Sequence, residues 1–166
     1  MSARFDIALL GDAHDRAGFS CGVAALDRYL REQASQDMRR RSSACYVALD
    51  AANAKVAGYY TLAAGGIPLT DLPQETIKRL PRYPSVPVAR IGRLAVASAY
   101  RGQHLGAALL WDAGIRAARS EVAIFALVVD AKDDAAVAFY RHHGFEPLGR
   151  QARQLVLPLS SFTKRP

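Results

Sequence analysis

The 166-residue sequence predicts a mixed α/β fold in which a mainly antiparallel sheet is flanked by helices. A strand–turn–strand pattern lies in the first half of the chain. Strand-like and helix-like runs alternate in the second half, and two short strand-like runs close it. Because helices separate the strands only in the second half, most neighbouring strands are expected to be antiparallel.

The first half is expected to form an amphipathic helix followed by a β-hairpin. Over about residues 22–40, apolar side chains recur at steps of three and four and so share one helix face: Val23, Leu26, Tyr29, Leu30 and Ala34. The far end of this helix is cationic, which suits a helix C-terminus. The runs SACYVALD and AKVAGYYTLAA, rich in Val, Tyr and Thr, predict two strands joined by DAAN.

The second half is expected to alternate between helices and strands. DLPQETIKRL predicts a short helix with Pro73 in its first turn, and the prolines that follow predict a loop. VPVARIGRLAV predicts a strand, GAALLWDAGIRAARS a helix, VAIFALVVD a buried strand and DDAAVAFYRHHG a helix closed by Gly144. FEPLG and RQLVLPL are expected to be the last two strands.

Length and composition indicate a single domain over residues 1–166, with 51% hydrophobic and 22% charged residues. No apolar run approaches the roughly 20 residues that span a bilayer, and the first residues lack the apolar core of a secretory signal. The cytoplasm is therefore the expected compartment. Cys21 and Cys45 form no metal motif and are expected to be small buried hydrophobes, so no metal site is predicted.

The net charge of +7 is concentrated in short basic clusters. Arg39, Arg40 and Arg41 are consecutive, and five further cations follow between Lys78 and Arg93. Such clusters favour polyanionic partners, either nucleic acid or a phosphorylated cofactor. A solvated surface that keeps the protein soluble explains the charge equally well, so charge alone does not decide.

The stretch SAYRGQHLGAALL joins a predicted strand to a predicted helix. A tight turn there points several backbone N–H groups into one concavity at the helix start, where they and the helix dipole favour an anion. Gly102 and Gly106 allow a phosphate to approach the backbone closely, and Arg101 adds a positive charge. On these residues alone, a simple turn remains the alternative.

This stretch resembles the acetyl-CoA loop of the GCN5-related N-acetyltransferases, (Gln/Arg)-x-x-Gly-x-(Gly/Ala). Residues 101–106, RGQHLG, fit that pattern, except that His104 stands where the family usually has glycine. The position is expected to need an unusual backbone angle, and histidine tolerates positive φ better than most residues.

A second segment, DDAAVAFYRHHGF, resembles the family motif Asn-x-x-Ala-x-x-(Phe/Leu)-Tyr-x-x-x-Gly-Phe. Asp133 replaces the usual asparagine. The resemblance implies that Asp133 keeps a helix N-cap role but contacts pantetheine differently from asparagine. The matching residues are Ala136, Phe139, Tyr140, Gly144 and Phe145.

The resemblance implies a fold whose sheet is splayed at the acetyl-CoA site, where the main chain at the end of one strand pairs with the pantetheine arm. The implied cofactor contacts are Leu94, Ala95, Val96, Arg101, Gly102, Gln103, His104, Leu105, Gly106, Ala107, Asp133 and Phe139. Tyr140 is the implied general acid for the leaving thiolate, with packing beside Phe139 as the alternative. No carboxylate stands out as a general base.

A narrower resemblance, to the toxin subfamily of type II toxin–antitoxin modules, covers most of the chain and includes the signature residues Cys21, Gly22, Leu26 and Asp27. It implies a toxin that acetylates the α-amino group of aminoacyl-tRNA and blocks translation, a ribbon–helix–helix antitoxin as partner and a homodimer. The cations expected to contact the tRNA backbone are Arg39, Arg40, Arg41, Lys78, Arg79, Arg90 and Arg93.

Two alternatives remain at this point. The chain is either an ordinary acetyltransferase for a small-molecule or protein amine, or a nucleic-acid-binding module without enzymatic activity. An amine-specific enzyme predicts an acidic acceptor pocket, and this sequence is poor in clustered acids. Tyr140 within its motif argues against the second alternative.

Overall fold

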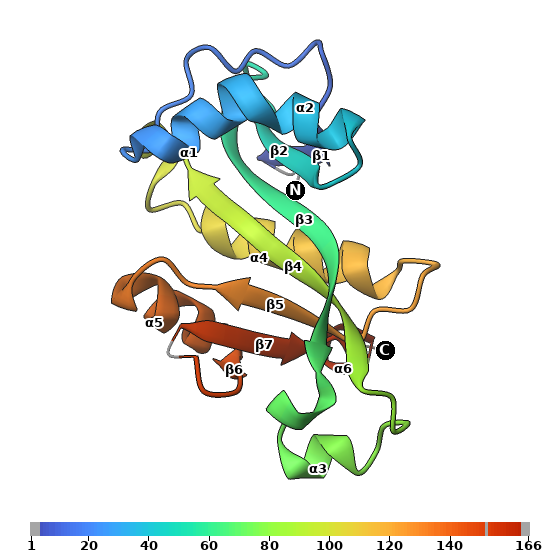
Figure 1. Cartoon of the computed structure of the whole chain (residues 1–166). Coiled ribbons are helices and arrows are strands. Elements are labelled where there is room, and N and C mark those ends of the chain that lie inside the picture. Colours follow the sequence, from blue (N-terminus) through green and yellow to red (C-terminus); the bar gives the residue numbers. More distant parts are fainter. Residues whose placement is uncertain (1–3, 152, 164–166) are drawn as a thin grey trace. The chain divides into compact units, whose positions relative to one another are not determined.

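The computed structural model describes residues 4–151 and 153–163, which contain seven strands interleaved with helices (Figure 1). The strands are β1 (Phe5–Leu9), β2 (Ala44–Asp50), β3 (Val56–Pro68), β4 (Ser85–Val96), β5 (Ala126–Asp130), β6 (Glu146–Pro147) and β7 (Gln154–Pro158). The helices are α1 (Ala24–Arg28), α2 (Ala34–Arg39), α3 (Gln74–Ile77), α4 (Leu105–Ala118), α5 (Asp134–His142) and α6 (Ser160–Thr163). The π-helical turn η1 (Tyr29–Gln33) joins α1 to α2, and two 3-10 turns are η2 (Leu69–Asp71) and η3 (Ser98–Tyr100).

The strand order is β1-β2-β3-β4-β5-β7-β6. The β1–β2, β2–β3, β5–β7 and β6–β7 pairs are antiparallel, and β4 pairs with β5 in parallel over Val88–Ile91. The predicted mixed, mainly antiparallel α/β class is therefore confirmed. So is the hairpin, in which Ala44 on β2 faces Leu62 on β3.

The structure adds one strand that the sequence pattern did not predict. In β1 the burial pattern does not alternate cleanly, since Ile7 and Ala8 are both half-buried. Five residues of this kind carry too little period-2 signal to be recognised as a strand. In the part of the chain that the structure describes, no helix is long and apolar enough to cross a membrane.

The chain divides into two compact units. The first unit contains the chain up to Ala63 together with Gly92–Ala113, and the second contains Ala64–Ile91 and the chain from Gly114 onward. Strands β3 and β4 each run from one unit into the other.

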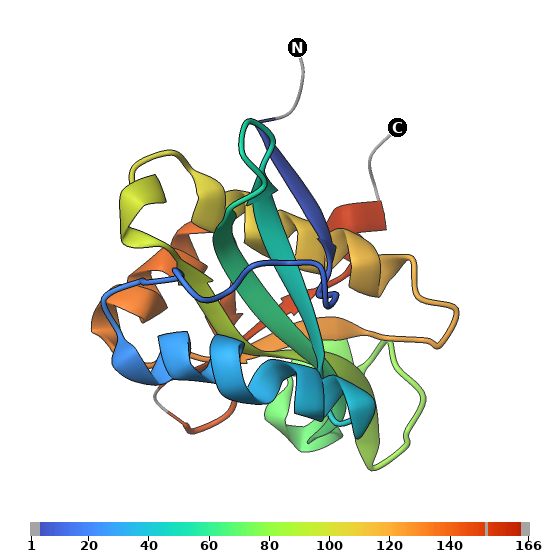
Figure 2. The same cartoon turned by 90° about the horizontal axis from the view of Figure 1, so that it is seen from above.

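In the first unit, helices cover both faces of the strands (Figures 1 and 2). The α1–α2 run packs Leu30 against Val47 and Tyr59 in one buried cluster. Successive residues of a strand point to opposite faces, so Gly58 and Tyr60 face the other way. There Leu109 of α4 lies against Gly58, and the Tyr60 hydroxyl donates to Asp112 Oδ2 at 2.6 Å.

The second unit has its own apolar cluster around the parallel and antiparallel neighbours of β5. Val88, Val128 and Val156, from β4, β5 and β7, are all buried in it. Ile77 of α3 packs against the same cluster, which fixes the short helix predicted from DLPQETIKRL to the sheet. Gly144 follows the C-cap residue of α5 and has a φ of +96°, as expected of a residue that closes a helix.

Gly58 is required where β3 passes close to β4. A Cβ at this position would lie 2.8 Å from the Ala95 carbonyl oxygen and 3.1 Å from Leu109 Cδ1. We expect Gly58→Ala to lower the free energy of unfolding by about 1–3 kcal/mol, measured by urea denaturation, because backbone must shift to admit the methyl group. Gly18→Ala is the control, since a Cβ at Gly18 would have no neighbour within 4 Å. Equal effects of the two substitutions would contradict this interpretation.

Candidate functional site

The turn between η3 and α4 adopts two left-handed residues within three positions. Gly102 has a φ of +77° and His104 a φ of +61°. The unusual backbone angle expected at His104 is thus confirmed. Left-handed conformation costs a residue with a Cβ about 1–2 kcal/mol. This turn therefore holds an energetically unfavourable conformation at the point where the sequence predicts a phosphate cradle.

The same turn leaves polar groups without protein partners. The first helical hydrogen bond of α4 runs from the Ala108 N–H to the His104 carbonyl at 3.1 Å, so the N–H groups of Leu105, Gly106 and Ala107 precede it. Among the described residues, Gln103 Oε1 is buried and accepts no hydrogen bond. Helix α4 is 14 residues long, and its dipole adds positive potential here. The cradle fits an anionic ligand that also supplies a donor.

Leu105 contributes to this site only through its main chain. Its side chain is 2% exposed and lies against the position of Gly58 on β3. Ala95 is also buried, whereas Leu94 and Val96 are half-buried. The parallel pairing of β4 with β5 ends at Ile91, three residues before Leu94. The main-chain pairing of Leu94–Val96 with pantetheine stays a prediction.

Arg101 is held by the turn that the signature residues build. Its guanidinium donates to the Cys21 carbonyl, and the Asp27 carboxylate accepts the Cys21 N–H at 2.9 Å. Gly22 has a φ of +88°, and a Cβ there would lie 3.0 Å from the Arg101 guanidinium. Hydrogen bonds of the signature residues thus connect the segment that precedes α1 to Arg101 of the cradle. Cys21 is buried, as expected.

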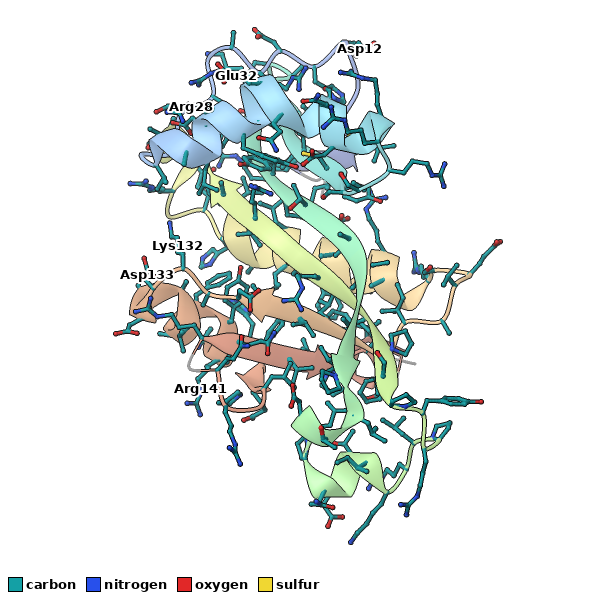
Figure 3. The ribbon with its side chains drawn as sticks, viewed as in Figure 1. Asp12, Arg28, Glu32, Lys132, Asp133 and Arg141 are labelled. Atoms are coloured by element: carbon teal, nitrogen blue, oxygen red, sulfur yellow. The ribbon has the colours of Figure 1, made fainter. Side chains whose placement is uncertain are left out.

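The second unit contains the other motif, on α5. Asp133 Oδ1 accepts the Ala136 N–H at 2.8 Å, which confirms the predicted N-cap role. Figure 3 shows Lys132 and Asp133 at the N-terminal end of α5 and Arg141 near its other end. The contact of Asp133 with pantetheine stays a prediction.

Tyr140 is 7% exposed and packs edge-to-face against Phe139 and Phe145, at ring centroid distances of 5.2 and 5.4 Å. The packing beside Phe139 that was the alternative is thus present, and the general-acid role of the Tyr140 hydroxyl stays a prediction. Burial raises the pKa of the Tyr140 hydroxyl to about 12, so it stays protonated at neutral pH. Within the described chain this hydroxyl has no hydrogen-bond partner. It can donate its proton to an added group.

The predicted RNA-binding cations differ in their surroundings. In the first unit, Arg39, Arg40 and Arg41 are exposed at the end of α2, and Arg41 has a φ of +59°. In the second unit, Lys78 and Arg79 are exposed, whereas Arg90 forms an ion pair with Asp130 at 2.8 Å.

Arg93 lies over an aromatic ring. Its guanidinium carbon is 3.6 Å from the centroid of the Tyr29 ring, a cation–π contact. The Tyr29 hydroxyl donates to Asp37 Oδ2 at 2.7 Å, and burial together with this bond raises the pKa of Tyr29 to about 12. The sequence pattern places Tyr29 only on the apolar helix face. It does not show the π-helical turn η1, which begins at Tyr29 and is a common feature of functional sites.

A mixed sheet with a strand–helix turn of this kind is the geometry with which many α/β proteins bind phosphate groups at a helix start. Residues 19–145 match the model of the acetyltransferase (GNAT) family, so the chain belongs to this family of acetyl-CoA-dependent acetyltransferases.

Similarities to individual proteins are more specific. A protein of Mycobacterium tuberculosis named "tRNA-acetylating toxin" is 37% identical over 139 residues, which cover 82% of this chain and 81% of that protein. The crystal structure of a tyrosine-to-phenylalanine mutant of KacT superposes with a TM-score of 0.88 at 28% identity, covering 98% of this chain and 99% of that chain. AtaT complexed with acetyl-methionyl-tRNAfMet gives a TM-score of 0.83 at 29% identity, with 96% and 97% covered.

A further AtaT mutant structure, bound to acetyl-CoA and to the C-terminus of the antitoxin AtaR, gives a TM-score of 0.81 at 26% identity and covers 98% of this chain and 100% of that chain. The homologues are thus tRNA-acetylating toxins of toxin–antitoxin systems, which use acetyl-CoA.

His104 allows a test of the cradle. His104→Gly removes the conformational cost without changing the turn, so we expect the acetyl-CoA Kd to stay within about threefold of the parent value. His104→Val is expected to weaken binding about tenfold or more, because a β-branched residue resists positive φ. Isothermal titration calorimetry measures both, and equal affinities for the two variants would contradict the role of this angle.

Proposed function

We propose that this protein is the toxin of a type II toxin–antitoxin module and transfers an acetyl group to the α-amine of aminoacyl-tRNA, which blocks translation. The observation that carries the proposal is the cradle at the start of α4, with left-handed His104 and the buried, unpaired Gln103 Oε1. The similarity to a tRNA-acetylating toxin over 82% of the chain supports the choice of acceptor.

The residues of the cradle fit acetyl-CoA. The N–H groups of Leu105, Gly106 and Ala107 would hold pyrophosphate oxygens, and Gln103 Oε1 would accept a donor from the cofactor. Gly102 and Arg101 complete the anion site, with Arg101 exchanging its bond to the Cys21 carbonyl or sharing it. The cofactor supplies an acetyl thioester. Leu94, Ala95, Val96, Asp133 and Phe139 are proposed to contact its pantetheine arm.

Tyr140 is proposed to hold the proton that the leaving group needs. The hydroxyl keeps this proton far above neutral pH, because burial raises its pKa to about 12. General-acid assistance of this kind is worth about 10²–10⁴ in rate. Glu75, Glu121 and Glu146 are exposed and offer no enclosed general base. The α-amine of an aminoacyl ester needs none, because the ester lowers its pKa below the roughly 7.7–8.0 of a chain terminus.

The acceptor RNA is proposed to be held through its phosphates. Arg39, Arg40 and Arg41 are exposed, and in the described structure no carboxylate neutralises them. Such cations position a polyanion without reading sequence. Lys78, Arg79, Arg90 and Arg93 complete the proposed set, with Arg90 shared with Asp130 and Arg93 fixed on Tyr29.

The partners proposed from the toxin subfamily are a ribbon–helix–helix antitoxin and a second copy of this chain. The cytoplasm is the proposed compartment, since charged tRNA is found there. We also propose that residues 1–166 act as a single domain, because β3 and β4 each belong to both units.

Radiolabelled acetyl-CoA tests the proposed acceptor. Label is expected on aminoacyl-tRNA and not on deacylated tRNA.

Tyr140→Phe is expected to lower kcat by about 10²–10⁴ while acetyl-CoA binding is retained. Between about pH 6 and pH 9.5 the rate of the parent enzyme is expected to rise to a plateau and not fall, because the Tyr140 hydroxyl stays protonated throughout. Label on polyamines or protein amines alone would identify an ordinary acetyltransferase instead.

The arginine cluster is tested by the salt dependence of tRNA binding. Replacing Arg39, Arg40 and Arg41 by alanine is expected to weaken binding and to reduce the slope of log K against log salt by about 0.9 for each phosphate that is no longer neutralised. The control is Arg119→Ala, which removes one cation beyond the end of α4. An unchanged slope in the triple variant would assign these arginines to the solvated surface.

A further inference from the structure

The loop between α3 and β4, whose course Figure 1 shows, carries a tyrosine that is exposed to solvent. Tyr83 is 69% exposed, whereas most tyrosines of this chain are buried or half-buried. Among the described residues its ring has no aromatic neighbour and its hydroxyl has no hydrogen-bond partner. The proposed function does not use this residue.

The loop that carries Tyr83 has a proline and a backbone hydrogen bond on each side of this residue. Pro81 and Pro84 restrict the chain on both sides of it. Before the loop, Leu80 packs against the apolar cluster of the second unit and donates its N–H to the Ile77 carbonyl at 3.1 Å. After the loop, the Pro84 carbonyl accepts the Leu69 N–H at 3.1 Å. The ring is thus presented from a short span anchored at both ends.

Three exposed cations precede this ring along the chain. Arg82 is its direct neighbour, and Arg79 and Lys78 precede it by a few residues. Lys78 makes only an exposed contact with Glu75 at 3.7 Å, which is worth little. Arg79 and Arg82 have no carboxylate partner in the described structure. We define Lys78, Arg79, Arg82 and Tyr83 as the basic aromatic loop.

A nucleobase fits such a loop better than a duplex does. An exposed ring offers a stacking face to any base, and flanking cations neutralise the backbone phosphates. In a duplex the base faces are already stacked inside the helix, so only unpaired nucleotides can use the ring. An acidic protein segment would be attracted by the cations, but its carboxylates offer no aromatic face on which Tyr83 could stack.

We propose that the basic aromatic loop binds unpaired nucleotides of RNA, with Tyr83 stacking on a base and Arg79 and Arg82 contacting phosphates. The proposal rests on the function proposed above and extends it, since it names the part of the RNA that the second unit recognises. It adds a source of affinity that phosphate contacts lack, namely a preference for single-stranded over double-stranded segments.

The test compares binding of a short unpaired RNA oligonucleotide with that of a blunt RNA duplex. Tyr83→Ala is expected to weaken binding of the oligonucleotide by about fivefold to a hundredfold and to leave duplex binding unchanged. Tyr83→Phe keeps the ring and is expected to bind as the parent does, whereas Tyr83→Leu is expected to behave like the alanine variant. Val122→Ala, at another exposed apolar residue of the second unit, is the control.

A direct readout of stacking is available because the chain has one tryptophan, Trp111. In Tyr83→Trp, the added fluorescence is expected to be quenched by the oligonucleotide and not by the duplex. Equal affinity of Tyr83→Ala and parent for the oligonucleotide would overturn the proposal. An equal loss of affinity of Tyr83→Ala for both RNAs would also overturn it. So would a Tyr83→Ala variant that loses affinity for an acidic peptide and not for RNA.

The test of the basic aromatic loop can succeed or fail independently of the test of acetyl transfer. With aminoacyl-tRNA as substrate, Tyr83→Ala is expected to raise KM with little change in kcat, since the loop only binds. Unchanged KM with active acetyl transfer would overturn the loop proposal and leave the proposed activity standing. Oligonucleotide binding that depends on Tyr83, without any acetyl transfer to tRNA, would support the loop proposal and contradict the proposed activity.

Discussion

The left-handed pair Gly102 and His104 is the backbone constraint on which the cradle proposed for acetyl-CoA depends. These two angles shape the turn that leads into α4, where three N–H groups precede the first helical hydrogen bond. The conformational cost at His104 is balanced by surrounding structure: Leu105 is buried against Gly58, and Arg101 is held by the Cys21 carbonyl. If the proposed cofactor binds here, it meets a turn that is already formed, so little ordering cost remains for binding.

Much of this arrangement could be predicted from residue patterns, because glycine, N-cap and apolar periodicity are local signals. The helix start near Leu105, the cap at Asp133 and the hairpin all follow from residues within a few positions of each other. Even the angle at His104 followed from a departure within a short motif.

The remaining features depend on contacts between residues far apart in sequence. From the sequence Gly22 is an ordinary loop glycine, whereas in the structure Arg101, from a distant part of the chain, lies beside it. From the sequence Arg93 is an ordinary strand cation, whereas in the structure its guanidinium lies on the Tyr29 ring. Asp130, which neutralises Arg90, follows it by 40 residues. No pattern within one segment carries such information, because the chain must fold before these groups meet.

These contacts divide the basic residues into two classes with different physical uses. Arg90, Arg93 and Arg101 have internal partners that fix their guanidinium planes, so little side-chain entropy is lost if they bind a ligand. Arg39, Arg40, Arg79 and Arg82 extend into solvent, where they attract a polyanion from a distance and adapt to it. The proposed aminoacyl-tRNA substrate would use both kinds of cation: mobile arginines would attract its phosphates, and fixed arginines such as Arg93 would hold it near the acetyl group.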